Sequence, residues 1–415
     1  MPSRAFPEEL LQRPTSERLA YFRAYTVAHP QLKVVSETLR RAIQEPGGAS
    51  LIFVVGPTGV GKTTLRLRIE QELRQRFLAA NKPEPGCVPV VGFEAAAPDS
   101  GNFNWKDYYR RALRALAEPL IDYKLDRPMP GRSGTEEWTT AARVCSPELR
   151  QALEQALRHR RPAAVLIDEA QHLTKIASGR RLSDQLDCLK SLASLTGCVH
   201  VLIGTYELLP CRNLSAQLSR RSRDIHFRRY RIDNPDDVVA FQRVIFSFQR
   251  HLTLAREPEL WRDWEFCYTH SLGCVGILKD WFTRALADAL ERGAPTLTRA
   301  DLERCAWSLD QCMTTARDTL DCESVFIEKV ETANRLRQLL GFGTMAGAEG
   351  AQPASTTPRP DMLPAGDGPL KRGSRRVGLR RPVRPASSNS AWIYSNARVF
   401  DLLGVILGPE SGKTT

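Results

Sequence analysis

The chain has 415 residues, 42% of them hydrophobic, which is enough for two folded units with a sizeable core. Its 59 Lys and Arg against 47 Asp and Glu give a net charge of +12, which suits a polyanionic partner such as nucleic acid. The start has no apolar core of signal-peptide length, no run reaches about 18 apolar residues, and the ten cysteines form no CxxC pair, so we expect a cytoplasmic protein without a membrane span, disulfides or zinc.

Apolar runs alternate with amphipathic stretches in the first half of the chain. Two helices are expected over 14–45, separated near His29-Pro30. Strand-like runs follow at 51–55, 88–93, 163–168, 198–204 and roughly 224–230. Helical stretches lie between them at about 63–79, 104–118, 147–160, 183–196 and 213–220. This alternation predicts an α/β fold with a parallel five-stranded sheet covered by helices on both faces.

Strand signals stop near residue 234, and composition changes again after Gly341. Helices expected at 235–251, 259–270, 275–292, 298–314 and 324–340 would form a small all-helical lid. The following stretch is rich in Gly, Pro, Ala and Thr, which predicts a flexible, disordered tail. The predicted parts are an N-terminal helical extension (1–48), an α/β core (49–232), a helical lid (233–345) and a flexible basic tail with an apolar end (346–415).

The stretch "VVGPTGVGKTT" (54–64) has the spacing of a phosphate-binding P-loop, Gly-x4-Gly-Lys-Thr. In such a loop backbone N–H groups surround the α- and β-phosphates, Lys62 reaches the β- and γ-phosphates, and the Thr63 hydroxyl binds Mg²⁺. An apolar strand before it and a helical stripe after it fit this interpretation. The predicted cofactors are ATP and Mg²⁺, and the predicted nucleotide contacts are Gly56, Pro57, Thr58, Gly59, Val60, Gly61, Lys62, Thr63 and Thr64.

A similar stretch, "GPESGKTT", ends the chain at 408–415. It is one residue too short between its glycines, and no residues follow to form the helix that should face the phosphates. We therefore expect a single nucleotide site, at the first loop.

The run "AVLIDEAQHL" ends an apolar strand with Asp168 and Glu169, the Walker B pattern. Asp168 would hold the Mg²⁺ shell and Glu169 would polarise the attacking water. The alternative is an ordinary acidic strand end, but the intact P-loop in the same chain favours the Walker B interpretation. Adjacent Asp and Glu indicate the branch of P-loop proteins with an extra strand between the two motifs, and we expect the 88–93 run to be one flank of it.

Four further polar residues are candidates for contact with the nucleotide. Thr205 follows the strand ending "LIGT" and would contact the γ-phosphate or the water, although it could equally be a helix N-cap. Arg221, and after it Arg223, would act across a subunit boundary on the transferred phosphoryl group, unless this Arg-rich stretch is a solvated or DNA-facing stripe. Lys279 starts a lid helix and could reach back to the nucleotide.

The segments "TVAHPQL", "GPTGVGKTTL", "FNWKDYYRRAL" and "LIDEAQHL" followed by "LIGTYELL" together resemble the TnsC/TniB family over roughly residues 15–310. Members are AAA+ ATPases that regulate target choice in Tn-type DNA transposition. The resemblance implies an ATP-dependent homo-oligomer, a ring or helical filament, on double-stranded DNA. It would bridge a target-selection protein and the transposase, and ATP hydrolysis would disassemble it.

The resemblance also implies roles for individual residues. His29 and Pro30 would belong to the nucleotide site, and Lys106, Arg110 and Arg111 would contact the DNA backbone. The alternative is that Trp105, Tyr108 and Tyr109 are the core of an amphipathic helix whose basic residues are solvated. Two departures from the family are an insertion near 119–146 and Lys in place of Arg at position 279.

Two other classes of protein remain alternatives. A replication-initiator or helicase-loader ATPase would share the core, but such proteins usually append a winged helix, and no strand-bearing hairpin is predicted after residue 300. A signalling or defence ATPase would need a fused effector. The tail segment "KRGSRRVGLRRPVRP" (371–385) has seven basic residues and is either a nucleic-acid arm or a solvated tail. The apolar segment 391–407 could dock on another protein.

Overall fold

The structure is a computed structural model that describes residues 5–79, 86–99, 101–121, 146–175, 182–212, 219–326 and 330–342. The chain divides into two units, Met1–Phe326 and Ile327–Thr415. In the second unit the described element is helix α13 (Val330–Leu339). The insertion near 119–146, most of the predicted 213–220 helix and the tail from 346, with its basic arm and second loop, lie outside the described residues.

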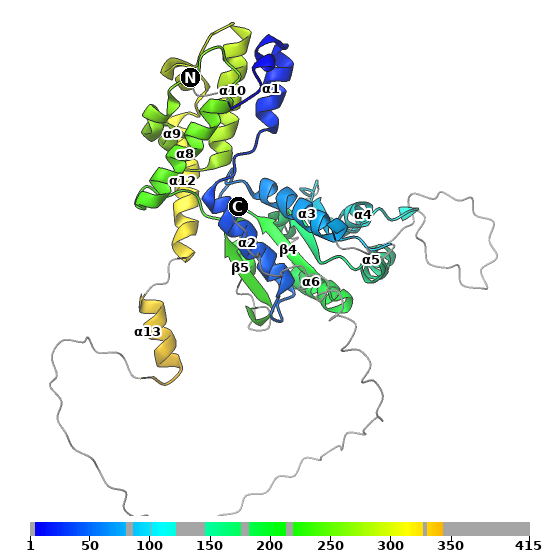
Figure 1. Cartoon of the computed structure of the whole chain (residues 1–415). Helices are drawn as coiled ribbons and strands as arrows, with labels where there is room; N and C mark the ends of the chain where they lie inside the picture. Colours follow the sequence, from blue (N-terminus) through cyan, green and yellow to red (C-terminus); the bar gives the residue numbers. More distant parts are fainter. Residues whose placement is uncertain are drawn as a thin grey trace, which may run out of the picture. The chain divides into compact units, whose positions relative to one another are not determined.

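Five parallel strands form one sheet in the first unit (Figure 1). Their spatial order is β2-β3-β4-β1-β5. They are β1 (Leu51–Val55), β2 (Val91–Glu94), β3 (Ala164–Asp168), β4 (Val199–Gly204) and β5 (Ser222–His226). Every residue of β1, β3 and β4 is buried, as expected for strands covered on both faces. The predicted five-stranded α/β core is confirmed.

Strand β4 is the extra strand between the two nucleotide motifs. It pairs with β1 on one side and β3 on the other. The expectation that the 88–93 run flanks it is wrong, because β2 lies at the sheet edge beyond β3. β2 also begins later than predicted, after Pro89, which has no N–H for a ladder. β5 ends at His226 instead of near 230, and Tyr230 donates its N–H to the carbonyl oxygen of Gly273 in the helical part.

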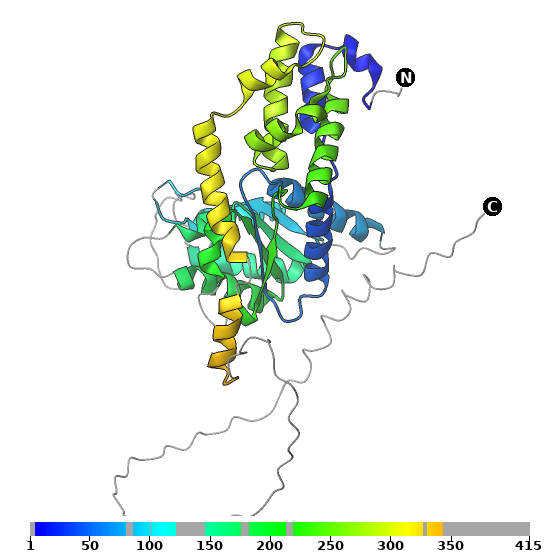
Figure 2. The same cartoon turned by 90° about the vertical axis from the view of Figure 1, so that its left-hand side faces the viewer.

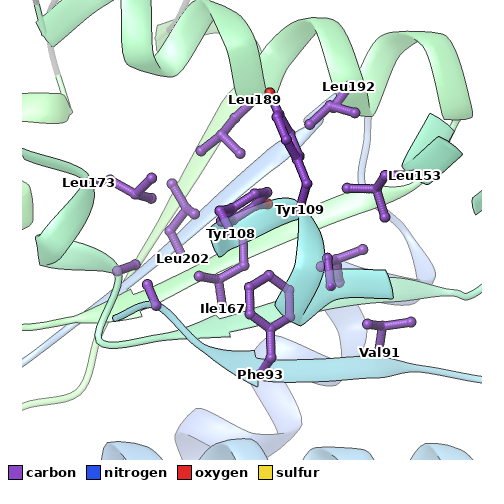
Figure 3. Close-up of a cluster of buried hydrophobic side chains, with 14 of the residues drawn as sticks. Val91, Phe93, Tyr108, Tyr109, Leu153, Ile167, Leu173, Leu189, Leu192 and Leu202 are labelled. Carbon is purple, nitrogen blue, oxygen red and sulfur yellow. The ribbon is translucent and has the colours of Figure 1, made fainter. Parts of the chain in front are cut away.

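Helices cover both faces of the sheet. On one face α2 (Pro30–Gln44) and α3 (Lys62–Ala79) bury leucine and isoleucine side chains against β1 and β4. On the other face lie α4 (Trp105–Ala115), α5 (Ser146–Arg160) and α6 (Leu182–Thr196). Figure 3 shows this second core, in which Tyr108 and Tyr109 of α4 lie among Phe93, Ile167 and leucines of the neighbouring elements.

After β5 the regular elements described up to Phe326 are all helices (Figure 2). The elements are α8 (Pro235–His251), η5 (Leu260–Asp263), α9 (Trp264–Ser271), α10 (Val275–Glu291), α11 (Arg299–Cys305), α12 (Leu309–Glu323) and η6 (Ser324–Phe326). The single helix predicted over 298–314 is divided into α11 and α12, because Ser308 and Gln311 form a capping box that starts a new helix.

The N-terminal segment contributes to both parts of the first unit. It contains η1 (Glu8–Gln12) and α1 (Thr15–Ala24), followed by α2. Phe22 and Val27 are buried in the aromatic core of the lid with Phe248, Trp281 and neighbouring residues. The link between α1 and α2 therefore runs from the lid to the sheet. None of the described helices has both the length and the apolar character that a membrane span needs.

Candidate nucleotide site

The loop between β1 and α3 has the backbone geometry of a phosphate cradle. Gly59 and Gly61 have φ angles of +74° and +111°, which favour glycine. At Gly56 a Cβ atom would lie 2.2 Å from the Phe227 carbonyl oxygen, so no side chain fits there. Helix α3 begins at Lys62, and its unpaired N–H groups and positive dipole end lie beside the loop. This arrangement suits a bound phosphate chain.

Lys62 is held in the loop, and its side chain is 7% exposed. Its Nζ donates to the carbonyl oxygens of Gly56 (3.1 Å) and Pro57 (2.8 Å). Burial lowers the pKa of Lys62, while Glu169 and Asp168 act in the opposite direction. The ammonium is therefore within electrostatic reach of both Walker B carboxylates. Thr63 is exposed in the first turn of α3, beside the half-buried Thr64.

Asp168 is the last residue of β3 and is 2% exposed. Its carboxylate accepts the N–H of Glu169 at 3.0 Å and pairs with Nε of Arg66 at 3.3 Å. Arg66 also pairs with the buried Glu70 on α3. Arg66 lies one helical turn after Lys62, and this spacing is the signal by which it could be found from the sequence. Thr63 and Asp168 together offer a hydroxyl and a carboxylate, oxygen donors of the kind that Mg²⁺ takes beside nucleotide phosphates, so these residues fit that ion.

Glu169 has an unusual backbone conformation and a fixed side chain. Its φ and ψ of 51° and 33° place it in the left-handed region, which is uncommon for residues other than glycine. Its carboxylate accepts a hydrogen bond of 2.5 Å from Nε2 of Gln171. The Oε1 atom of Gln171 accepts the N–H of Thr205 at 3.2 Å. Gln171 thus links the ends of β3 and β4, a role that sequence reasoning missed.

Thr205 follows β4 directly and precedes the 3-10 helix η4 (Tyr206–Cys211). Although it occupies the N-cap position, its side chain makes no capping hydrogen bond. Its hydroxyl is buried and has no partner among the described residues. A buried hydroxyl without a partner is costly, so this atom is available to a ligand at the same strand edge as Glu169.

A small pocket of about 150 Å³ adjoins the P-loop, a volume that holds one aromatic ring in other proteins. Its lining combines the α1–α2 link, the P-loop and the start of α10, and includes Val27, His29, Val60, Gly61, Thr64, Val275, Gly276 and Lys279. His29 is 6% exposed, and its Nδ1 lies 3.0 Å from the Tyr230 hydroxyl. Burial, helped by the charge of Arg68, lowers the pKa of His29 to about 4, so its ring is neutral near pH 7. Pro30 is exposed at the first position of α2.

The lid contacts the P-loop through the start of α10. The N–H of Gly276 donates to the Gly59 carbonyl oxygen at 2.6 Å, and a Cβ on Gly276 would lie 2.5 Å from that oxygen. Lys279, one turn further along, donates to the carbonyl oxygens of Phe22 and Tyr25 and lies 4.4 Å from the centre of the Phe22 ring. Burial lowers its pKa to about 8. Its ammonium therefore binds the α1–α2 link, and a contact with the phosphates would require these bonds to break.

The candidate arginines lie where the sheet strands begin, whereas the P-loop lies where the strands end. Ser222, at the start of β5, pairs with Leu51 at the start of β1, whereas the P-loop follows the end of β1. The length of a five-residue strand, roughly 13 Å, separates the two edges. Arg220, Arg221 and Arg223 are exposed, and Arg221 donates to the Ser194 hydroxyl at 3.1 Å. The structure does not bring them to the P-loop of their own chain.

The proposed DNA contacts lie on α4. Tyr108 and Tyr109 are 1% and 3% exposed, and Trp105 donates to Gln185. These aromatic side chains therefore belong to the core, as expected if α4 is an amphipathic helix that packs on the sheet. Lys106, Arg110 and Arg111 are half-buried on the same helix, and Arg111 pairs with Asp107 at 2.5 Å. Their contact with DNA stays a prediction.

A family model described as an AAA domain matches residues 44–212. This part of the chain is therefore similar to AAA domains. The match covers the P-loop, both Walker B carboxylates and Thr205. The match agrees with the predicted AAA+ fold of the core, whereas ATP hydrolysis by this chain and its TnsC/TniB subfamily stay predictions.

Several solved structures are similar to this chain, each at 14% identity. One is the ORC2 protein of Aeropyrum pernix in its ADP form, with a TM-score of 0.46 over 69% of this chain and 71% of that one. Another is Drosophila ORC bound to DNA, with 0.44 over 82% and 86%. A third is a Walker-type ATPase of Pyrococcus abyssi, with 0.41 over 77% and 81%. No curated protein matches the sequence.

Proposed function

We propose that this protein is a Mg²⁺-dependent ATPase whose ATP-bound form assembles on duplex DNA and regulates DNA transposition. The observation that supports hydrolysis is the arrangement at the carboxyl ends of β1, β3 and β4. These adjacent strands carry Lys62, Glu169 and Thr205 to one edge of the sheet, beside the P-loop.

In the proposed reaction the P-loop N–H groups hold the phosphates of ATP, and the base occupies the pocket beside the neutral His29. Lys62 exchanges the carbonyl oxygens of Gly56 and Pro57 for the β- and γ-phosphate oxygens. Thr63 and Asp168 would hold Mg²⁺, which neutralises charge on the phosphates. Glu169 polarises the attacking water, and the unpartnered hydroxyl of Thr205 binds the γ-phosphate or that water.

We propose further that the site is completed by a second copy of the chain. The exposed arginines at the amino end of β5 are too far from their own P-loop, but they can reach that of a neighbour in a head-to-tail assembly. An arginine so placed would stabilise the charge on the transferred phosphoryl group. Repetition of this contact generates a ring or a helical filament.

Duplex DNA is proposed as the surface for assembly, and a target-selection protein and a transposase as the partners. The support is the resemblance of the quoted motifs to the TnsC/TniB family, the net charge of +12 and the basic residues of α4. The alternative is a replication-initiator or helicase-loader ATPase. Such proteins usually append a winged helix, and the regular elements described within residues 227–326 are helices.

The test is a salt titration of binding to duplexes of unrelated sequence, with ATP, with ADP and without nucleotide. We expect ATP-dependent assembly on every duplex, with an affinity that falls steeply as salt rises because phosphate contacts release counterions. Binding that needs no nucleotide and is lost on deletion of 371–385 would contradict the assembly model. A preference for one origin-like sequence would favour the alternative function.

A further inference from the structure

Gln171 lies between the two groups that the proposed reaction uses to address water and the γ-phosphate. It belongs to the 3-10 helix η3 (Ala170–Thr174), directly after the Walker B carboxylates, and is 5% exposed. Its amide contacts Glu169 on one side and the backbone of Thr205 on the other. Gln171 has no role in the proposed reaction as described above.

The chemistry of the neighbours fixes the orientation of this amide. The Thr205 N–H can only donate, so the amide atom 3.2 Å from it must be the oxygen. The nitrogen then points to the Glu169 carboxylate, which when ionised can only accept. Both the oxygen and the nitrogen of the amide form a hydrogen bond. Rotating the amide by half a turn would place its nitrogen against the Thr205 N–H and its oxygen against the Glu169 carboxylate.

The end of β4 is shaped to leave room for the amide. A Cβ atom on Gly204 would lie 2.5 Å from Oε1 of Gln171, so the absence of a side chain at 204 lets the amide approach the strand. At the other end, Glu169 has a left-handed backbone directly after the last residue of β3, and its carboxylate accepts from the Gln171 amide. A hydrogen bond from a buried amide to a carboxylate is stronger than one between neutral groups, so Gln171 restrains the carboxylate effectively.

We propose that Gln171 is a positioning residue that sets the direction of the Glu169 carboxylate and couples it to Thr205. The inference rests on the proposed ATPase function. When the γ-phosphate engages the Thr205 hydroxyl, a shift of the Thr205 backbone moves the Gln171 amide and with it the carboxylate. Gln171 would thus tie the activation of water to the presence of the γ-phosphate.

The chain contains a matched control for this arrangement. In the lid, Gln249 is 3% exposed and also bridges a carboxylate and a backbone N–H, with Nε2 3.1 Å from Glu257 and Oε1 3.1 Å from the N–H of Trp261. Gln249→Met and Gln171→Met remove the same pair of hydrogen bonds at similar side-chain volume. A loss caused merely by a disrupted buried amide should be seen in both.

The experiment measures ATP hydrolysis by the full chain with duplex DNA, together with equilibrium binding of a fluorescent ATP analogue. For Gln171→Met we expect kcat to fall about 10- to 100-fold, with analogue affinity within about threefold of the unaltered chain, since the carboxylate is present but misdirected. Gln249→Met should leave kcat within about twofold. In Glu169→Gln, a second change Gln171→Met should lower the rate no further, because the group that it positions is already gone.

Two results would overturn the inference. Equal rates for Gln171→Met and the unaltered chain would do so alone, and so would multiplying effects of Gln171→Met and Glu169→Gln, which indicate a separate structural role. If Gln171→Met fails to fold, Gln171→Glu replaces it. This variant keeps the acceptor for Thr205 but repels Glu169, so it too should lose kcat and keep affinity, and a retained kcat overturns the inference. No hydrolysis by the unaltered chain would overturn the proposed function and this inference together.

Discussion

The central sheet has a carboxyl edge, where its strands end beside the P-loop, and an amino edge, where its strands begin. These two edges are built in opposite ways. At the carboxyl edge Lys62, Asp168 and Gln171 are 7%, 2% and 5% exposed, and their polar atoms are held by hydrogen bonds or ion pairs. At the amino edge Arg220, Arg221 and Arg223 are exposed. Buried polar groups are costly unless they are paired, whereas exposed arginines can change partners at little cost. One edge is thus preorganised for a ligand, and the other is free to meet a second molecule.

The largest expected effect comes from the carboxyl edge. Glu169→Gln should lower kcat by about 10²- to 10⁴-fold, the range of general acid–base catalysis, because the amide no longer activates water. ATP affinity should be retained, and the protein should stay in its assembled state. Steady-state ATPase assays and sedimentation with ATP check this. The control is Glu72→Gln, because Glu72 pairs with Arg68 on α3 and has no role in the proposed reaction. Hydrolysis at the parent rate would refute the role of Glu169.

The next largest effect tests the P-loop against its C-terminal copy. Lys62→Ala should weaken ATP binding roughly 100-fold or more, since loss of one partner of a buried charged contact costs about 3 kcal/mol. Deletion of 390–415 should leave binding unchanged. Equilibrium titration of both variants gives the answer. Residual tight binding in Lys62→Ala, lost when 390–415 is also deleted, would show that the second loop binds nucleotide.

The lid contact is expected to matter less. Gly276→Ala puts a Cβ 2.5 Å from the Gly59 carbonyl oxygen, and because that atom is backbone, the lid or the P-loop must shift. We expect ATP affinity to fall about tenfold and the free energy of unfolding to drop by about 1–3 kcal/mol, as for other overpacked sites. ATP titration and chemical denaturation measure the two effects. Unchanged affinity would mean that this contact does not shape the nucleotide site.

The smallest effect concerns α4. Lys106→Ala should weaken binding to unrelated duplexes to a similar degree and reduce the slope of log affinity against log salt by roughly one, because a phosphate contact carries no base information. Deletion of 371–385 is the comparison. If that deletion reduces the slope more than Lys106→Ala does, the tail is the main DNA contact and α4 is not.

Much of the fold could be predicted from the sequence because single strong signals determine it. The Gly-x4-Gly-Lys-Thr spacing and the buried runs before Gly56 and Asp168 sufficed for the P-loop, Walker B and the sheet. Contacts between distant residues could not be predicted. Gln171 stands in the quoted "IDEAQHL", but its partner Thr205 lies on another strand, and Lys279 is held by carbonyl oxygens more than 250 positions away.

Helix and strand ends depend on both local and distant contacts. Ser308 and Gln311 have the capping-box spacing, so the start of α12 can be found from the sequence. The bond between the Tyr230 N–H and Gly273 of the lid, shortly after the end of β5, could not be predicted because it joins residues far apart in the chain.

The central claim is that the carboxyl edge of one chain, with its P-loop and Glu169, contacts the amino edge of a second chain, with its exposed arginines. Mixing experiments test it most directly, with Arg221→Ala and Glu169→Gln chains that are each inactive alone. The account predicts that the mixture recovers part of the ATPase activity, because an unaltered carboxyl edge from the first chain can face an unaltered Arg221 from the second. No recovery with Arg221→Ala, nor with Arg220→Ala or Arg223→Ala in its place, would contradict it and indicate a site that is complete within one chain.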